Sequence, residues 1–180
     1  RDLRMSRGLG DVYKRQFLIL TQQKELYVLH SASFLYRGRA FLVSGSSGTG
    51  KSTHSALWHD LYQTPLLNGD LNLLGIRNSI PYAYGLPWCG TSGICTPKDY
   101  PLGGIIFLKQ AAIDQVQSLQ PDEKVLHILQ RMISPAWTKE LLLRNLHFSE
   151  ALAPLIFSCR LYCTKEPSAA RTLKAVIDAL

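Results

Sequence analysis

The sequence predicts an α/β fold in which helices flank a mixed β-sheet. Short apolar stretches bounded by Gly, Pro and Asn predict strands, and longer stretches with a 3.6-residue apolar period predict helices. The two kinds of element do not alternate strictly along the chain, which favours a mixed sheet over a regular parallel one. A glycine-rich loop, GSSGTG, stands between one such strand and one such helix.

In the first part of the chain, short apolar runs lead up to this loop. Strands are expected over residues 17–21, 26–29, 33–36 and 40–44. The last two flank Arg37-Gly38-Arg39, which reads as a hairpin turn because it contains glycine. A helix is expected over residues 51–61, with its first turn at the end of the glycine-rich loop.

The remaining elements follow from the same periodicities. Strands are expected over residues 66–67, 71–77, 104–108 and 155–163. Helices are expected over residues 121–133, 136–146 and 169–180. Residues 82–93, YAYGLPWCGTSG, are rich in Gly, Pro and Thr, so a loop of functional character is expected there.

The first sixteen residues, RDLRMSRGLGDVYKRQ, do not look native. SRGLGDVYKRQ is the translation of a transposon adapter used in sequencing libraries, so residues 1–16 are interpreted as adapter-derived and excluded from the fold. The alternative is a natural basic arm or a targeting segment. Native sequence then begins at Phe17, and residues 17–180 are expected to form a single nucleotide-binding domain that lacks its N-terminal part.

Charge and hydropathy favour a protein with one anion-binding site. The formal net charge is +7, of which residues 1–16 supply +3 through five basic and two acidic side chains. The remaining +4 is modest, so nucleic acid is not an expected partner. The longest apolar runs, residues 103–108 and 151–157, are too short to span a membrane, and a cytoplasmic location is expected. Neither pair of cysteines, 89/95 or 159/163, has the C-x2-C spacing of a common zinc site.

The glycine-rich loop matches the phosphate-binding pattern G-x4-G-K-[ST], the Walker A motif or P-loop. Glycines let successive amides point at phosphate oxygens, and a following helix adds its positive dipole end. Lys51 would bridge the β- and γ-phosphates, and the Ser52 hydroxyl would coordinate Mg²⁺. The expected nucleotide-binding residues are Gly45, Ser46, Ser47, Gly48, Thr49, Gly50, Lys51, Ser52 and Thr53.

Two further side chains are candidates for the same site. Asp70 follows a short apolar run and is the one acidic residue between Asp60 and Asp99, so it is the candidate second ligand of the metal. Its alternative role is a plain Gly-Asp turn. His30 lies upstream of the loop, and a lone histidine is more often a core or surface residue.

The ordered set of motifs resembles a known superfamily. His30, a fifteen-residue step to Gly45, GSSGTGKST, LLNGD and PWCGTSG together resemble the HPr kinase/phosphorylase and ATP-type phosphoenolpyruvate carboxykinase superfamily. Compact bacterial HPr-kinase-like proteins are the most similar group. The resemblance implies a P-loop kinase fold of this type, with ATP and Mg²⁺ as cofactors and Lys51, Asp70 and His30 as catalytic residues.

The chain departs from the family at one position. Relatives have paired aspartates where this sequence has Gly69-Asp70, and Asp70 matches the second of them. One carboxylate therefore remains for two roles, the metal ligand and the base that activates the acceptor hydroxyl. His30 is the substitute base that the sequence offers, since an imidazole titrates near neutral pH.

The last candidates for the site are residues 87–93 and three arginines. Cys89, Gly90, Thr91 and Ser92 could line the acceptor side of the γ-phosphate, or the segment could serve only as a turn with a core Trp88. The candidates for stabilising transition-state charge are Arg77, Arg131 and Arg144, among which the sequence does not choose.

The resemblance implies an ATP-dependent phosphotransferase acting on a serine, threonine or other hydroxyl. The acceptor would be an unidentified protein, peptide or small molecule, and a homo-oligomeric assembly is left open. One alternative is an ATP-binding regulatory module that has lost turnover. Another is a carboxykinase-like enzyme or a different P-loop NTPase.

Overall fold

The computed structural model describes residues 3–86 and 93–180, and within them the strands form one eight-stranded mixed sheet. The strand order is β2-β1-β4-β5-β6-β8-β7, and β3 pairs with β1. The strands are β1 (Tyr27–Tyr36), β2 (Arg39–Ser44), β3 (Leu66–Asn68), β4 (Leu71–Arg77), β5 (Ile80–Tyr84), β6 (Tyr100–Gln110), β7 (Gln115–Ser118) and β8 (Phe157–Cys163). The predicted α/β class with a mixed sheet is confirmed.

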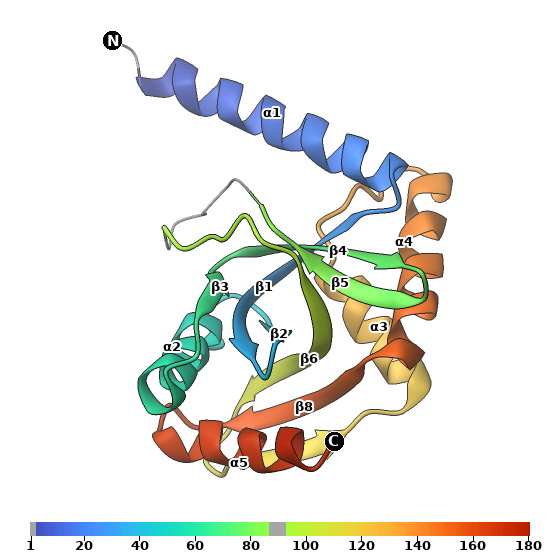
Figure 1. Ribbon diagram of the computed structural model, residues 1–180. Helices are drawn as coiled ribbons and strands as arrows, with labels where there is room; N and C mark the ends of the chain where they lie inside the picture. Colours follow the sequence, from blue (N-terminus) through green and yellow to red (C-terminus); the bar gives the residue numbers. More distant parts are fainter. Residues whose placement is uncertain (1–2, 87–92) are drawn as a thin grey trace.

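The sheet curls until β2 pairs with β6, so that five strands form a closed ring (Figure 1). β2 is antiparallel to β1 and parallel to β6. On its other edge β6 pairs in parallel with β8, and its first residues pair with β5. The end of β2, where the glycine-rich loop begins, therefore has β1 on one side and β6 on the other.

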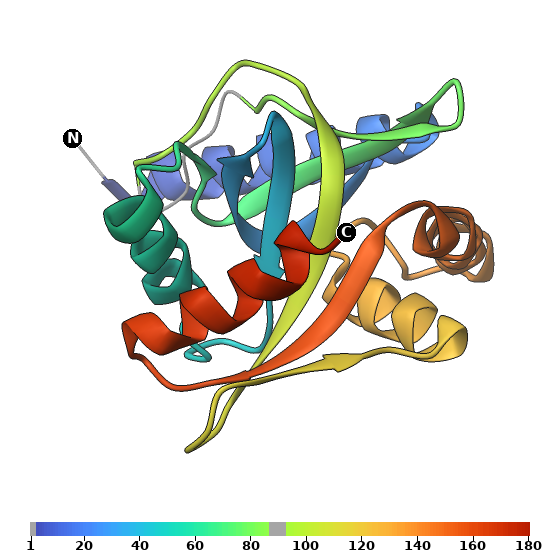
Figure 2. The same cartoon turned by 60° about the horizontal axis from the view of Figure 1, so that its bottom comes forward.

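Helices cover both faces of the sheet. They are α1 (Leu3–Gln23), α2 (Lys51–Tyr62), α3 (Pro121–Arg131), α4 (Lys139–Leu152) and α5 (Pro167–Asp178), with a short 3-10 turn η2 (Ala153–Leu155). Figure 2 shows α2 and α5 together on one side of β6 and β8, and α3 and α4 on the other. This arrangement buries both faces of the central strands.

Successive residues of β2 and β6 point into two separate cores. Phe41 and Val43 join Ile106 and Trp58 in the core beneath α2 and α5. Leu42 and its neighbours on β6 join the core beneath α3 and α4. The alternation follows from the two-residue repeat of a strand, and it explains why both strands read as continuous apolar runs.

The predicted strand over residues 17–21 is wrong, because this segment is the last part of helix α1. A short apolar run fits either element, and here the helix is fixed by its contacts. Phe17 and Leu18 pack against the core cluster of β1 and β4. Gln22 is buried and its amide donates to Pro135 O, Leu141 O and Asn145 Oδ1 at 2.9, 3.1 and 2.7 Å. Residues 12–16 are exposed.

Two strands are absent from the sequence prediction. Residues 82–84, expected in a loop, belong to β5, which pairs with β4 across a two-residue turn at Asn78 and Ser79. Both turn residues have positive φ, 52° and 62°, without the glycine that usually marks such a turn. β7, Gln-Val-Gln-Ser, is a polar strand with one neighbour and has no apolar pattern.

The strands predicted over residues 26–29 and 33–36 are one continuous strand, β1, and α4 extends to Leu152, beyond the predicted end at residue 146. The remaining elements agree with the prediction to within a few residues. The predicted hairpin turn has φ of 50° at Arg37 and 74° at Gly38 and connects β1 to β2, with Tyr36 opposite Arg39. Helix α4 starts later than expected, at Lys139, because Thr138 caps it by accepting a hydrogen bond from Leu141 N at 3.3 Å.

Close approach of β2 and β6 at Gly103 gives a first prediction. A Cβ at Gly103 would lie 2.6 to 3.0 Å from ring atoms of Phe41. Gly103→Ala should therefore lower the free energy of unfolding by about 1–3 kcal/mol, as overpacking does. The measurement is urea unfolding. Phe41→Leu replaces this ring with a smaller side chain, so the double variant should lose less free energy of unfolding than the two single variants together. Additive losses would contradict the contact.

A buried histidine in α2 gives a second prediction. His54 accepts a hydrogen bond from Trp58 Nε1 at 3.2 Å, and burial lowers its pKa to about 4. The unfolded chain would bind this proton at its usual pKa near 6.5, so stability is complete above pH 6.5 and declines as the pH falls towards 4. The expected loss is about 3 kcal/mol.

Denaturant unfolding at several pH values checks this expectation. His54→Gln should flatten the decline between pH 6.5 and 4, because glutamine does not titrate. His147→Ala removes an exposed histidine and should keep the full decline. An unchanged decline in His54→Gln would assign the effect to another group.

Candidate functional site

The glycine-rich loop, residues 45–50, has a conformation that requires glycine at its two ends. A Cβ at Gly45 would lie 2.6 Å from Thr49 Oγ1 and 3.2 Å from Leu108 O. Gly50 precedes the first residue of α2 with φ of 100°, which favours glycine. Thr49 holds the curl by donating to Ser46 O at 2.8 Å through its hydroxyl. The loop therefore joins β2 to the N-terminus of α2, as the pattern predicted.

Lys51, the first residue of α2, folds back over the loop. Its ammonium group donates to Gly45 O and Ser46 O, both at 3.1 Å. Burial lowers the pKa of Lys51, and the nearby Arg131 lowers it further, while Asp70 opposes both effects. Ser52 and Thr53 are exposed in the same first turn. The loop, a cation and a helix N-terminus thus share one face, a combination that suits phosphate.

Asp70 is positioned by a network of buried polar groups. The Asn68 side chain accepts from Asp70 N at 3.0 Å and from Leu71 N at 3.1 Å. Asn68 N is in turn bonded to Ser33 Oγ at 3.1 Å, and that hydroxyl donates to Asn72 Oδ1 at 2.7 Å. The network fixes the turn between β3 and β4 against β1.

His30 lies beside this turn on β1. Ser31 N donates to Asp70 O at 3.1 Å, and Ser44 Oγ donates to His30 O at 2.8 Å, so the backbone ties β1 to both neighbours. Burial and the Lys51 charge lower the pKa of His30, while Asp70 and a hydrogen bond with its backbone raise it. The structure brings His30, Lys51 and Asp70 together; their catalytic roles remain predictions.

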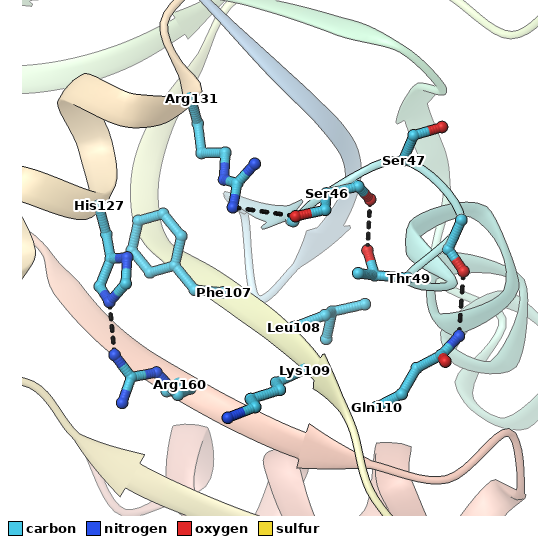
Figure 3. Close-up of a pocket in the computed structure, with 12 residues that line it drawn as sticks. Ser46, Ser47, Thr49, Phe107, Leu108, Lys109, Gln110, His127, Arg131 and Arg160 are labelled. Atoms are coloured by element: carbon cyan, nitrogen blue, oxygen red, sulfur yellow. Dashed lines mark hydrogen bonds between the residues drawn. The ribbon is translucent and has the colours of Figure 1, made fainter.

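Arg131 is the arginine of the three candidates that reaches the loop. Its Nη2 donates to Ser46 Oγ at 3.3 Å (Figure 3). Its Nε is buried and has no hydrogen-bond partner among the described residues. Arg77 instead covers the Tyr82 ring at 4.4 Å, and Arg144 pairs with Glu140 at 2.9 Å. Arg131 therefore adds a second cation beside the loop.

A cavity of about 530 Å³ opens next to the loop (Figure 3). It is bounded by residues 45–49, the end of β6, helix α3 and strand β8. Its lining side chains outside the loop are Phe107, Leu108, Lys109, Gln110, His127, Arg131 and Arg160. Apart from Arg131, the sequence prediction did not include these residues. No local motif marks them, because the fold brings them together from three separate elements.

The remaining predictions concern the acceptor loop, the metal and the membrane. Cys89, Gly90, Thr91 and Ser92 lie outside the described residues. Within residues 3–86 and 93–180, no cluster of three or more His, Cys, Asp or Glu could hold a metal ion. Oxygen ligands for Mg²⁺ are available from Ser52 and Asp70. None of the described helices has the length and apolar character that a membrane crossing needs.

Comparisons with known proteins give distant likenesses among solved structures. No known protein family matches the chain, and no curated protein matches its sequence. Among solved structures, the chain is similar to the Hpr(Ser) kinase/phosphatase from Coxiella burnetii, with 9% sequence identity and a TM-score of 0.43. The match covers 84% of this chain and 98% of that one. The site itself, rather than this likeness, supports the functional proposal.

Proposed function

We propose that the protein is an ATP-dependent phosphotransferase that moves the γ-phosphate of MgATP to a hydroxyl acceptor. The observation that supports this proposal best is the convergence of Lys51, Asp70 and His30 at one end of the glycine-rich loop. A nucleotide-binding loop needs only its amides and a cation. The addition of a carboxylate and an uncharged imidazole supplies what phosphoryl transfer also requires.

Binding would depend on positive charge. The loop amides and the N-terminus of α2 would hold the phosphate oxygens, and Lys51 would exchange its carbonyl partners for them. Ser52 and Asp70 would hold Mg²⁺, a hard cation that prefers oxygen ligands. When bound, Mg²⁺ would neutralise charge on the β- and γ-phosphates. Arg131 could donate to the same oxygens through Nη2, which already contacts the loop at Ser46 Oγ.

The transfer needs a base for the acceptor hydroxyl. Burial and the Lys51 charge lower the pKa of His30, so its imidazole is neutral at pH 7 and can take a proton. The acceptor O–H bond then breaks with its proton moving to His30, a new O–P bond forms, and the bond from the γ-phosphorus to the ADP oxygen breaks. Asp70 stays with the metal in this scheme, and His30 replaces the carboxylate that Gly69 lacks.

The acceptor is proposed as the hydroxyl of a serine or threonine in a protein or peptide, or of a small alcohol. A cytoplasmic location and a homo-oligomeric assembly remain expectations from the sequence. A second candidate is an ATP-binding module without turnover, which the single carboxylate at residues 69–70 favours.

Substitutions at Lys51 and Asp70 test the proposal. The chain is incubated with γ-labelled ATP and cell extract, and label in an acceptor or in free phosphate is counted. Lys51→Ala should lower both ATP binding and transfer by about 100-fold or more, since it removes a charged donor to the phosphates. Asp70→Asn should keep ATP binding without Mg²⁺ and lose the Mg²⁺-dependent transfer.

Matched controls are available on exposed surfaces. Lys139→Ala and Asp60→Asn remove the same kinds of side chain elsewhere and should leave transfer unchanged. ATP binding without any labelled product in the wild type would favour the binding module. Absence of ATP binding would refute both candidates.

The role of His30 gives a pH prediction. Protonated His30 cannot act as a base, so the transfer rate should fall on the acid side with a midpoint below pH 6.5, where burial places the pKa. His30→Gln should lower the rate by about 10²–10⁴-fold and abolish this acid limb. His147→Ala is the exposed control. A His30→Gln variant with the wild-type rate and pH profile would assign the proton to another group.

A further inference from the structure

We propose that the cavity beside the glycine-rich loop holds the nucleoside of the bound nucleotide, with the terminal phosphate directed to Asp70. This inference rests on the proposed function and goes further, because it assigns a direction to the nucleotide. It also assigns a binding role to His127 and Arg160, which lie on α3 and β8.

The direction follows from the neighbours of β2. The metal and base candidates, Asp70 and His30, both lie on the β1 side of the loop, because the Asp70 turn is bonded to β1 through Ser31 N. The cavity lies on the β6 side, against residues 107–110. A nucleotide stretched along the loop with its terminal phosphate near Asp70 must place its other end towards β6.

The size of the cavity suits a nucleoside. Its volume of about 530 Å³ lies within the range of small-molecule sites, about 300–1,000 Å³. The phosphates need only the amides along one wall, so most of this space is left for another group. Gln110 lines the same space and ties it to the loop by donating to Gly48 O at 3.0 Å.

The wall opposite the loop contains His127 and Arg160, and neighbouring side chains hold both of them in place. The His127 ring packs on Phe107, with ring centroids 5.0 Å apart and planes tilted by 31°. Arg160 donates to His127 Nε2 at 2.6 Å (Figure 3). It also donates to Gln117 Oε1 at 3.2 Å. Imidazole and guanidinium planes are surfaces on which nucleobases stack. Because neighbours from β6 and β7 hold these two groups, little ordering remains to be lost on binding.

The surroundings of His127 favour its neutral form. Burial and the adjacent Arg160 lower the pKa of His127, while Glu123 raises it. Arg160 can only donate, so Nε2 is the acceptor of their hydrogen bond and the other ring nitrogen carries the proton. None of the described residues that line the cavity is acidic. An anionic effector or acceptor would also be attracted by these cations. Comparing ligands with and without a nucleoside distinguishes the two cases.

The test compares two ligands that share phosphates and differ in the nucleoside. Binding of MgATP and of magnesium tripolyphosphate to the full chain is measured by titration calorimetry. The wild type should bind ATP at least about 10-fold more tightly than tripolyphosphate. Arg160→Ala and His127→Ala should each reduce this preference about 10-fold while changing tripolyphosphate binding little. Lys51→Ala should weaken both ligands together.

Controls exclude loss of the fold. Arg144→Ala removes an arginine of α4 that lies outside the cavity and pairs with Glu140, as Arg160 pairs with Glu123, and it should leave the preference unchanged. Thermal unfolding is recorded for every variant. If Arg160→Ala or His127→Ala does not fold, Lys109→Ala decides, because this side chain lines the cavity and is exposed.

The outcomes separate this inference from the function on which it rests. Equal weakening of both ligands by Arg160→Ala would mean that the cavity attracts charge alone and would overturn the nucleoside assignment. An unchanged preference in all cavity variants would overturn it as well, with the phosphotransferase proposal intact. Failure of the wild type to bind either ligand would overturn the proposed function itself.

Discussion

Residues 40–44 of β2 are paired on both edges, with β1 on one side and with β6 on the other. The side chains along this segment are also buried on both faces of the sheet. The strand therefore has no freedom to shift without breaking two ladders and two cores. Because the glycine-rich loop starts at its last residue, the loop inherits this fixed position. The groups on β1 and on β6 are then held at set places to either side of it.

A second constraint acts on the β1 side through polar groups. Ser31, Ser33, Asn68 and Asn72 are buried and bonded to one another or to backbone atoms. Buried polar groups are costly when left without partners, so such a network holds its members in one arrangement. The network ends at the turn that carries Asp70, through Asn68 Oδ1. The backbone that carries Asp70 is therefore held in place by side chains of β1, β3 and β4.

Local signals in the sequence were sufficient for the elements that have them. Residues 51–61 and 71–77 have a clear loop-to-helix transition and a bounded apolar run, and both match α2 and β4 closely. Residues 17–21 fit a strand or a helix equally well, and the buried contacts of Gln22, far away in sequence, decide for the helix. The Asn78-Ser79 turn lacks glycine, so nothing local separates β4 from β5.

Some residues of the candidate site are marked by local sequence signals, and others are brought together only by the fold. The glycine-rich loop could be located because the spacing of its glycines and lysine is what phosphate binding requires. Asp70 followed from its position after the loop, and His30 followed from the family resemblance. The choice of Arg131 over Arg77 and Arg144 needed the fold, since all three are ordinary surface candidates in the sequence. His127 and Arg160 are 33 positions apart and meet only because α3 packs near β8. No periodic pattern in the sequence predicts such a contact.

The closed ring of strands also limits how copies of this chain could associate. β2 ends the strand order on one side, but its outer edge is covered by β6. At the other end stands β7, four residues long, with exposed Gln115, Gln117 and Ser118. A short polar edge is a poor template for an added strand, which is how many sheet proteins avoid aggregation. Extension of the sheet into a neighbour at β7 is thus disfavoured, and association of copies through this edge is not expected.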